Sequence, residues 1–238
     1  MQTVLITGGA RGIGKAMVEV FSANGYKVAF TYKKSEYAAK SLAESTGALA
    51  ICADSARECD VTRAVERARE ALGHIDCLIN NAGVSAFSLF TDISLDDWND
   101  MLSVNLTGAF LYTKAVLSDM ISKKSGRIIN ISSMWGIVGS SCEVHYSTAK
   151  AGLIGMTKAL AKELGPSGIT VNAIAPGVID TEMNKMLSDD DRAALIDETP
   201  LMKIGTPEDV ANAALFLASE KASFITGEVM NLSGGFIV

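Results

Sequence analysis

The chain has 238 residues, of which 48% are hydrophobic, and it carries a formal net charge of −6. This length is enough for one large domain with a sizeable core. The 21 lysines and arginines are outnumbered by 27 acidic residues and are scattered along the chain, which argues against a nucleic-acid or anionic-membrane surface. The apolar runs are far shorter than the roughly 20 residues of a membrane-spanning helix, and the first residues lack a signal-peptide pattern, so we expect a cytoplasmic protein.

Cysteines and histidines are few and widely spaced. Cys52, Cys59, Cys77 and Cys142 form no C-x-x-C pair, whereas zinc sites and disulfide frameworks usually show closely spaced ligands or pairs. We therefore predict no metal site and expect the cysteines to pack as small hydrophobic residues.

Short β-rich apolar runs alternate with amphipathic stretches along nearly the whole chain. Strands are predicted at 4–6, 27–32, 48–53, 75–80, 127–132, 169–175 and 228–232. Helices are predicted at 13–21, 60–73, 94–122, 146–164 and from Pro207 onward. This order is typical of an α/β fold. We predict a Rossmann-like doubly wound parallel sheet of about seven strands, built by a single domain that spans residues 1–238.

One segment lacks this alternation. Between Pro176 and Thr206 the sequence gives no strand signal, and a loop of about thirty residues inside a compact domain usually has a function. We interpret residues 178–206 as a substrate lid.

A glycine-rich turn follows the first predicted strand. The glycines at positions 8, 12 and 14 do not fit the G-x-G-x-x-G spacing, yet they meet the same needs: a tight turn, close approach of the backbone to a pyrophosphate, and helix packing against the sheet. The amino end of the next helix would then face the phosphates. A glycine-rich turn without a ligand is the alternative interpretation.

The end of the second predicted strand indicates which dinucleotide binds. NAD sites place an acidic residue there for the ribose 2′-hydroxyl, but this strand ends Thr31-Tyr32-Lys33-Lys34. Arg11 and Lys33 could instead neutralise a 2′-phosphate, which favours NADP(H). The alternative is that both lysines are solvated turn residues.

Three polar residues could meet near the fifth predicted strand. Tyr146 and Lys150 are four positions apart in a predicted helix and therefore lie on one face. Ser133 ends the strand, at the carboxyl edge where doubly wound folds bind ligands. By itself the Tyr-x-x-x-Lys pair could equally be a surface pair.

Together these motifs resemble the short-chain dehydrogenase/reductase family. The resemblance covers nearly the whole chain and includes Thr7-Gly8-x-x-x-Gly12-Ile13-Gly14, Asp54, Asn80-Asn81-Ala82-Gly83, Asn105, Ser133, Tyr146-x-x-x-Lys150 and Pro176-Gly177 leading to Thr181. Ser55 departs from the valine that commonly follows Asp54 in the family.

The resemblance implies a catalytic set of Asn105, Ser133, Tyr146 and Lys150. Tyr146 would protonate a carbonyl oxygen while the nicotinamide delivers hydride to its carbon, Ser133 would hold that oxygen, and Asn105 would support a water that relays protons to Lys150. Bringing a tyrosine pKa from 10 to near 7 requires about 4 kcal/mol, and a lysine ammonium about 4 Å away supplies roughly that amount. We expect Lys150 to provide it and to bind the nicotinamide ribose.

The resemblance also implies a cofactor-binding set. It consists of Gly8, Gly9, Ala10, Arg11, Gly12, Ile13, Gly14, Lys33, Asp54, Ser55, Asn81, Ala82, Gly83, Tyr146, Lys150, Pro176, Gly177, Ile179 and Thr181. His145 and Cys142, which adjoin the catalytic residues, are interpreted as packing residues because neither has an evident partner for acid–base or nucleophilic chemistry.

Within the family, the chain most resembles bacterial 3-oxoacyl-(acyl-carrier-protein) reductases, notably at residues 126–133, 150–155, 168–172 and 180–190. This implies an NADPH-dependent reductase of a 3-oxoacyl thioester, a homotetramer, and an acyl carrier protein as partner. We expect that partner to dock at the basic cluster of Lys123, Lys124 and Arg127, although the lysines could simply complement a helix dipole.

Residues 134–139 and 142–145 look more like reductases of a ketone-bearing lysine modification, of the 5-aminopentanone type, on elongation factor P. That activity is the alternative. An NAD-linked alcohol or sugar dehydrogenase is disfavoured by the missing strand-two carboxylate, and a non-catalytic NADP sensor by the complete catalytic set.

Overall fold

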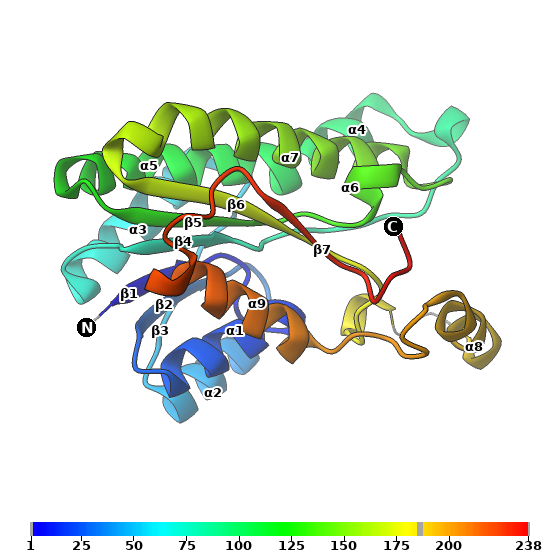
Figure 1. The fold of residues 1–238 in the computed structure, drawn as a ribbon, viewed down its shortest axis with the longest axis horizontal. Helices are drawn as coiled ribbons and strands as arrows, with labels where there is room; N and C mark the ends of the chain where they lie inside the picture. The colour runs from blue at the N-terminus through cyan, green and yellow to red at the C-terminus, as the bar shows by residue number, and fades with distance from the viewer. Residues whose placement is uncertain (1, 185–187, 238) are drawn as a thin grey trace.

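Seven parallel strands form one sheet of order β3-β2-β1-β4-β5-β6-β7, which confirms the predicted Rossmann-like α/β fold (Figure 1). The computed structural model describes residues 2–184 and 188–237. The strands are β1 (Thr3–Ile6), β2 (Lys27–Tyr32), β3 (Leu49–Cys52), β4 (Cys77–Asn80), β5 (Gly126–Ile131), β6 (Ile169–Pro176) and β7 (Val229–Leu232). They lie within two residues of the predicted ranges, and each β-to-α crossover brings the following loop to the carboxyl edge of the sheet.

Helices cover both faces of this sheet (Figure 1). They are α1 (Gly12–Ala23), α2 (Glu36–Thr46), α3 (Glu58–Leu72), α4 (Leu95–Leu102), α5 (Gly108–Lys123), α6 (Trp135–Val138), α7 (Val144–Leu164), α8 (Asp189–Glu198) and α9 (Pro207–Ala218). One face carries α1, α2 and α9, and the other carries α3, α5 and α7. Among the described residues, no helix is long and apolar enough to cross a membrane.

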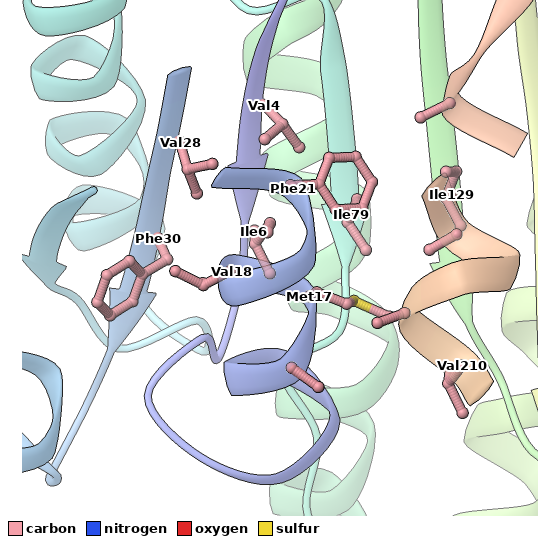
Figure 2. Packing of buried hydrophobic residues seen from close by; sticks show 14 of the residues in the cluster. Val4, Ile6, Met17, Val18, Phe21, Val28, Phe30, Ile79, Ile129 and Val210 are labelled. Carbon is pink, nitrogen blue, oxygen red and sulfur yellow. The ribbon is translucent and has the colours of Figure 1, made fainter. Parts of the chain in front are cut away.

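Alternation along the central strands divides the core into two layers. Val4 and Ile6 of β1 pack toward α1, whereas Leu5 between them packs toward α3 and α5. Strands buried on both faces require apolar residues at every position, which explains the continuous Val4-Leu5-Ile6 run. Figure 2 shows Met17 and Phe21 of α1 packed over this strand.

Three helices of the described chain were not predicted, namely α2, α8 and the four-residue α6. α2 buries only Ala39 and Leu42, and α8 buries no residue, so neither produces the apolar periodicity on which sequence assignment depends. The segment predicted to be a substrate lid contains α8, although residues 185–187 lie outside the described part of the chain.

The predicted helix 94–122 has an interruption. Its capping box is confirmed, because Ser94 and Asp97 exchange side-chain and backbone hydrogen bonds. After α4, however, Ser103–Thr107 form a π-helical turn before α5 begins. Such turns are rare and often occur at functional sites, and this one contains Asn105.

The expected docking cluster of Lys123, Lys124 and Arg127 is wrong in its location. Arg127 pairs in register with Cys77 at the start of β4 and β5, which is the amino edge of the sheet and the opposite edge from the ligand site predicted after the strands. Its side chain is 11% exposed and lies 3.2 Å from Glu220, while Lys123 lies 2.9 Å from Asp76. Lys123 and Arg127 therefore form local ion pairs at the amino edge.

The cysteines do not all behave as buried hydrophobic residues. Cys77 is buried, but Cys52 and Cys59 are exposed and Cys142 is half-buried. All four are free thiols. Burial was overestimated because Cys52 ends an edge strand and Cys59 begins a helix.

Candidate active site

A cavity of about 520 Å³ opens at the carboxyl edge of the sheet. The turn after β1 and the segments after β2, β3, β4, β5 and β6 all contribute to its walls. Ligands of open α/β sheets bind in this crevice, where the strand order reverses.

The glycine turn brings the backbone close to the cavity. Gly8 has φ +67°, and a Cβ on Gly14 would lie 2.2 Å from the Gly8 carbonyl oxygen. The Asn81 amide donates to the carbonyls of Thr7 (2.9 Å) and Gly8 (3.1 Å), which ties the end of β4 to this turn. Only glycine fits such an approach.

The amino end of α1 is suited to an anion. Gly12 begins the helix, no side chain caps it, and its first turn holds no acidic residue. Backbone N–H groups at an uncapped helix start are available for phosphate oxygens and add a positive dipole end. The residues at this turn therefore fit a dinucleotide pyrophosphate.

Two cations lie at the part of the cavity formed by the β1 and β2 loops. Lys33 Nζ is 2.6 Å from Asp54, and Arg11 is 3.6 Å from Glu182. Both cationic side chains are more than half exposed, so these ion pairs contribute little and can be exchanged for a phosphate at small cost.

Tyr146 and Lys150 project from α7 into the same cavity as Ser133. Ser133 lies beside the Tyr146 hydroxyl and opposes the rise of the Tyr146 pKa. Lys150 Nζ donates to the Ile131 carbonyl at 2.9 Å and lies 5.6 Å from the centre of the Tyr146 ring. The Tyr146 phenol, the Ser133 hydroxyl and the Lys150 amine are thus held together at one cavity.

Asn105 supports this group from behind the cavity wall. Its side chain accepts from Val84 N–H at 3.2 Å and donates to the Val84 carbonyl at 3.0 Å, which fixes the loop after β4. A Cβ on Gly83 would lie 2.8 Å from Asn105 Oδ1 and 3.3 Å from Lys150 Nζ. The glycine therefore lets this loop approach both side chains.

Loss of hydration is the largest influence on the pKa values of Tyr146 and Lys150. It raises the pKa of Tyr146 to about 12, with the Ser133 hydroxyl opposing and the Glu143 charge adding to the increase. Burial also lowers the pKa of Lys150 to about 8. The expectation that Lys150 brings Tyr146 near 7 is thus not met in this structure, because Lys150 does not outweigh the loss of hydration around the phenol. At neutral pH Tyr146 holds its proton.

Nearly all predicted site residues line the cavity. They are Gly8, Ala10, Arg11, Gly12, Ile13, Gly14, Lys33, Asp54, Ser55, Asn81, Ala82, Gly83, Ser133, Tyr146, Lys150, Pro176, Gly177, Ile179 and Thr181. Gly9 is not among them, since its N–H donates to the Thr31 carbonyl and it packs against Phe30. Asn105 also lies outside the lining.

His145 and Cys142, which adjoin Tyr146 in the sequence, differ in their surroundings. His145 is 1% exposed and packs inside the fold, and its Nδ1 has no hydrogen-bond partner among the residues described. Cys142 has φ +61°, and its carbonyl accepts from Ser88 N–H at 2.8 Å. Neither side chain lines the cavity.

Several lining residues were missed by the sequence analysis. Trp135, Glu143, Glu182 and Asn184 are the most distinctive. Glu143 stands three positions before Tyr146, and i,i+3 spacing places two side chains on one helix face, so that signal was present in the sequence. Trp135 belongs to a four-residue helix that has no pattern of its own.

Comparisons with known proteins agree with this geometry. A family profile described as Enoyl-(Acyl carrier protein) reductase matches residues 8–237. The chain is 45% identical over 236 residues to the 3-oxoacyl-(acyl-carrier-protein) reductase FabG of Aquifex aeolicus, covering 97% of this chain and 95% of the relative. It is 40% identical over 233 residues to the protein of the same name from Escherichia coli, with the same coverage. A solved double mutant of a short-chain dehydrogenase/reductase from Serratia marcescens superposes with a TM-score of 0.92 at 35% identity, covering 99% of this chain and 97% of that one.

Proposed function

Because this chain belongs to the short-chain dehydrogenase/reductase family and is an oxidoreductase acting on CH–OH or C=O groups, we propose that it reduces the ketone of a 3-oxoacyl thioester to a hydroxyl with NADPH. The observation that carries this proposal is the meeting of a protonated Tyr146, Ser133 and Lys150 in one cavity. The substrate class is supported by relatives at 37–45% identity that are named for it.

The residues have distinct roles in the proposed reaction. The bound nicotinamide supplies a hydride for the carbonyl carbon. Ser133 donates a hydrogen bond to the carbonyl oxygen, and Tyr146 transfers its hydroxyl proton to that oxygen as negative charge develops there. The Lys150 ammonium stabilises the phenolate that Tyr146 becomes. Asn105 holds the loop after β4 in place and supports the water that returns a proton through Lys150.

The proposed cofactor is NADP(H). The turn at Gly8 and Gly14 with the start of α1 would hold the pyrophosphate, and Arg11 and Lys33 would bind the 2′-phosphate in place of their present carboxylate partners. The absence of a carboxylate at the end of β2, which finishes at Tyr32, supports this preference over NAD.

We also propose the wider setting that the relatives suggest: a homotetramer in the cytoplasm, with acyl carrier protein presenting the substrate. Residues 178–206 would act as the lid. Ile179, Thr181 and Glu182 support that role because they line the cavity next to the cofactor turn.

The test is a turnover assay that follows NADPH oxidation with a panel of carrier-bound 3-oxoacyl thioesters. The expected result is saturable oxidation with formation of the 3-hydroxyacyl product, and a much lower rate with NADH. Failure on every 3-oxoacyl thioester, together with turnover of ketone-modified elongation factor P, would move the substrate to the alternative.

A further inference from the structure

A buried tyrosine hydroxyl close to the cavity has no hydrogen-bond partner. Tyr112 of α5 is 1% exposed, and its hydroxyl is unpartnered among the described residues. Nearly all buried polar groups in proteins are hydrogen-bonded, because a buried donor without a partner destabilises the fold. Tyr112 does not itself line the cavity. It can therefore reach a ligand only through the residues between them.

Two hydroxyl side chains stand between Tyr112 and the cavity. Thr31 near the end of β2 and Ser55 after β3 both line the cavity, with exposed fractions of 1% and 8%. Both lie beside the Tyr112 hydroxyl. Loss of hydration raises the pKa of Tyr112 above its ordinary value of 10.0, so the phenol keeps its proton at neutral pH and is a hydrogen-bond donor.

Thr31 is fixed in place, whereas Ser55 is not held by a strand. Thr31 Oγ1 accepts from Gly8 N–H at 3.3 Å, and the Thr31 carbonyl accepts from Gly9 N–H at 2.8 Å. Ser55 lies in the turn between β3 and α3. A serine hydroxyl can accept one hydrogen bond while it donates another, and its side chain can rotate between staggered positions. Ser55 is therefore the residue able to link Tyr112 with a ligand.

Close packing holds the Ser55 turn against α5. Gly108 is the first residue of α5, and a Cβ on it would lie 2.8 Å from the Ser55 carbonyl oxygen and 3.1 Å from Ser55 Cβ. Tyr112 follows four residues later and lies on the same helix face. Because the backbones are already in contact, rotation of the Ser55 side chain is enough to bring the two hydroxyls together.

We propose that Tyr112 is a positioning residue for the dinucleotide. Its phenol donates a hydrogen bond to Ser55 Oγ when the cofactor is bound, and this directs the Ser55 proton toward a hydrogen-bond acceptor of the cofactor. The inference rests on the proposed function, since it assumes that a dinucleotide occupies this cavity. Binding would thus provide the partner that the Tyr112 hydroxyl lacks in the free chain.

This role predicts opposite effects of one substitution on stability and on binding. Tyr112→Phe removes the hydroxyl and keeps the ring. In the ligand-free chain it removes a buried polar group that has no partner, so the free energy of unfolding should not fall. In the complex it removes a hydrogen bond that positions Ser55, so NADPH should bind more weakly. A phenol with a purely structural role would not separate the two measurements in this way.

The experiment measures the NADPH dissociation constant by fluorescence titration and the thermal unfolding of the ligand-free chain. The proteins are the wild type, Tyr112→Phe, Ser55→Ala and the double variant. Tyr26→Phe is the matched control, because Tyr26 is half-buried, packs edge-on against Phe21 and precedes β2 at the amino edge of the sheet.

We expect Tyr112→Phe to weaken NADPH binding by about threefold to tenfold, the range for one hydrogen bond between neutral groups. Its unfolding temperature without ligand should equal or exceed that of the wild type. Ser55→Ala should weaken binding at least as much, and adding Tyr112→Phe to it should cause no further loss, because the two residues act as one unit. Tyr26→Phe should bind NADPH as the wild type does.

Three results would overturn the inference: wild-type affinity in Tyr112→Phe, a lower unfolding temperature of ligand-free Tyr112→Phe, or losses of affinity that simply add in the double variant. Each of these leaves the proposed function intact, since the wild type still binds NADPH. Failure of the wild type to bind NADPH would instead refute the proposed cofactor and the inference with it.

Discussion

Lys150 is buried and Tyr146 is half-buried, and the loss of hydration favours the neutral form of each. For Tyr146 that form is the phenol, which is the form a proton donor requires. For Lys150 burial lowers the pKa to about 8, close enough to neutral pH that the side chain can both carry charge and exchange protons. The protonation states of Tyr146 and Lys150 therefore suit the proposed reduction of a carbonyl.

Replacing the phenol hydroxyl should abolish proton transfer while leaving the cofactor in place. We expect Tyr146→Phe to lower kcat by at least about 10²-fold, because general acid catalysis contributes about that much. NADPH binding, measured by fluorescence titration, should change little. The control is Tyr37→Phe, whose ring is 89% exposed and far from the chemistry. A near-wild-type rate in Tyr146→Phe would refute its role as the acid.

Lys150 should reduce the stability of the fold at neutral pH. Above about pH 8 the folded chain loses this proton, whereas the unfolded chain keeps it up to its ordinary pKa of 10.5, so the Lys150 contribution to the free energy of unfolding rises with pH across this window. The full difference corresponds to about 3 kcal/mol. We expect Lys150→Met to be more stable than the wild type at neutral pH, with a gain that shrinks as the pH rises from 8 toward 10.5.

Denaturant unfolding of both proteins at several pH values measures this effect. Lys162→Met, an exposed position on the same helix, is the control and should show no such trend. A gain in stability that does not vary with pH would show that the Lys150 ammonium is not disfavoured by burial.

At the scale of elements, the helices and strands that could be predicted from the sequence are those with a clear hydrophobic pattern. All seven strands were found, because a parallel strand buried on both faces reads as a short continuous apolar run. The helices with a long apolar face were found as well, whereas α2, which buries only Ala39 and Leu42, was missed. α8 was missed because it buries nothing, although Ser188 and Asp191 form the same capping box that identified Ser94. The π-helical turn at Ser103–Thr107 was not predictable, since it depends on tertiary contacts of Asn105 with the loop after β4.

The candidate site was predictable for a related reason. Its residues follow strand ends, and parallel strands bring their carboxyl ends to one edge. Glu143 was missed although its spacing from Tyr146 was visible. A single carboxylate in a sequence does not indicate a binding role, and this one gains significance only because it lines the cavity. The location of Arg127 was wrong because charge clusters in sequence do not specify an edge of the sheet.

Under the proposed function, the turn between β1 and α1 would determine the cofactor preference. Arg11 is the N-cap residue of α1 and lines the cavity, and we propose that it neutralises the 2′-phosphate of NADPH. We expect Arg11→Ala to weaken NADPH binding by about 1.5 to 3 kcal/mol, the range for hydrogen bonds to a charged group, and to leave NADH binding nearly unchanged. Calorimetric titration with both dinucleotides measures this. Equal losses for NADPH and NADH would place Arg11 on the pyrophosphate instead.

At the scale of the whole molecule, the two edges of the sheet have different tasks. The carboxyl edge carries the cavity and its polar side chains. The amino edge carries buried or paired charges that join distant segments: Asp76 accepts from Thr3 N–H at 3.0 Å and pairs with Lys123, and Arg127 reaches Glu220 beyond α9. The polar groups at the amino edge therefore stabilise the fold.

Arg127 tests that division, because the sequence suggested a docking role for it. Its side chain is 11% exposed, and the Nε atom has no described partner, whereas Glu220 is 77% exposed. Arg127→Glu would place a carboxylate in this buried position beside Glu220, so we expect it to lower the free energy of unfolding by about 3 kcal/mol or more. Glu220→Gln should cost no more than about 1 kcal/mol, since the carboxylate is solvated.

Arg127→Met separates stability from docking. It removes the charge but keeps an apolar side chain in the buried space, and such replacements are often nearly neutral for stability. We therefore expect Arg127→Met to fold and to leave the KM for a carrier-bound 3-oxoacyl thioester unchanged, because the residue lies at the edge opposite the cavity. Steady-state kinetics with carrier-bound and small thioesters measures this. If Arg127→Met raises the KM severalfold for the carrier-bound substrate alone, Arg127 contributes to docking of the carrier protein. The amino edge would then have a role in substrate binding as well as in stability.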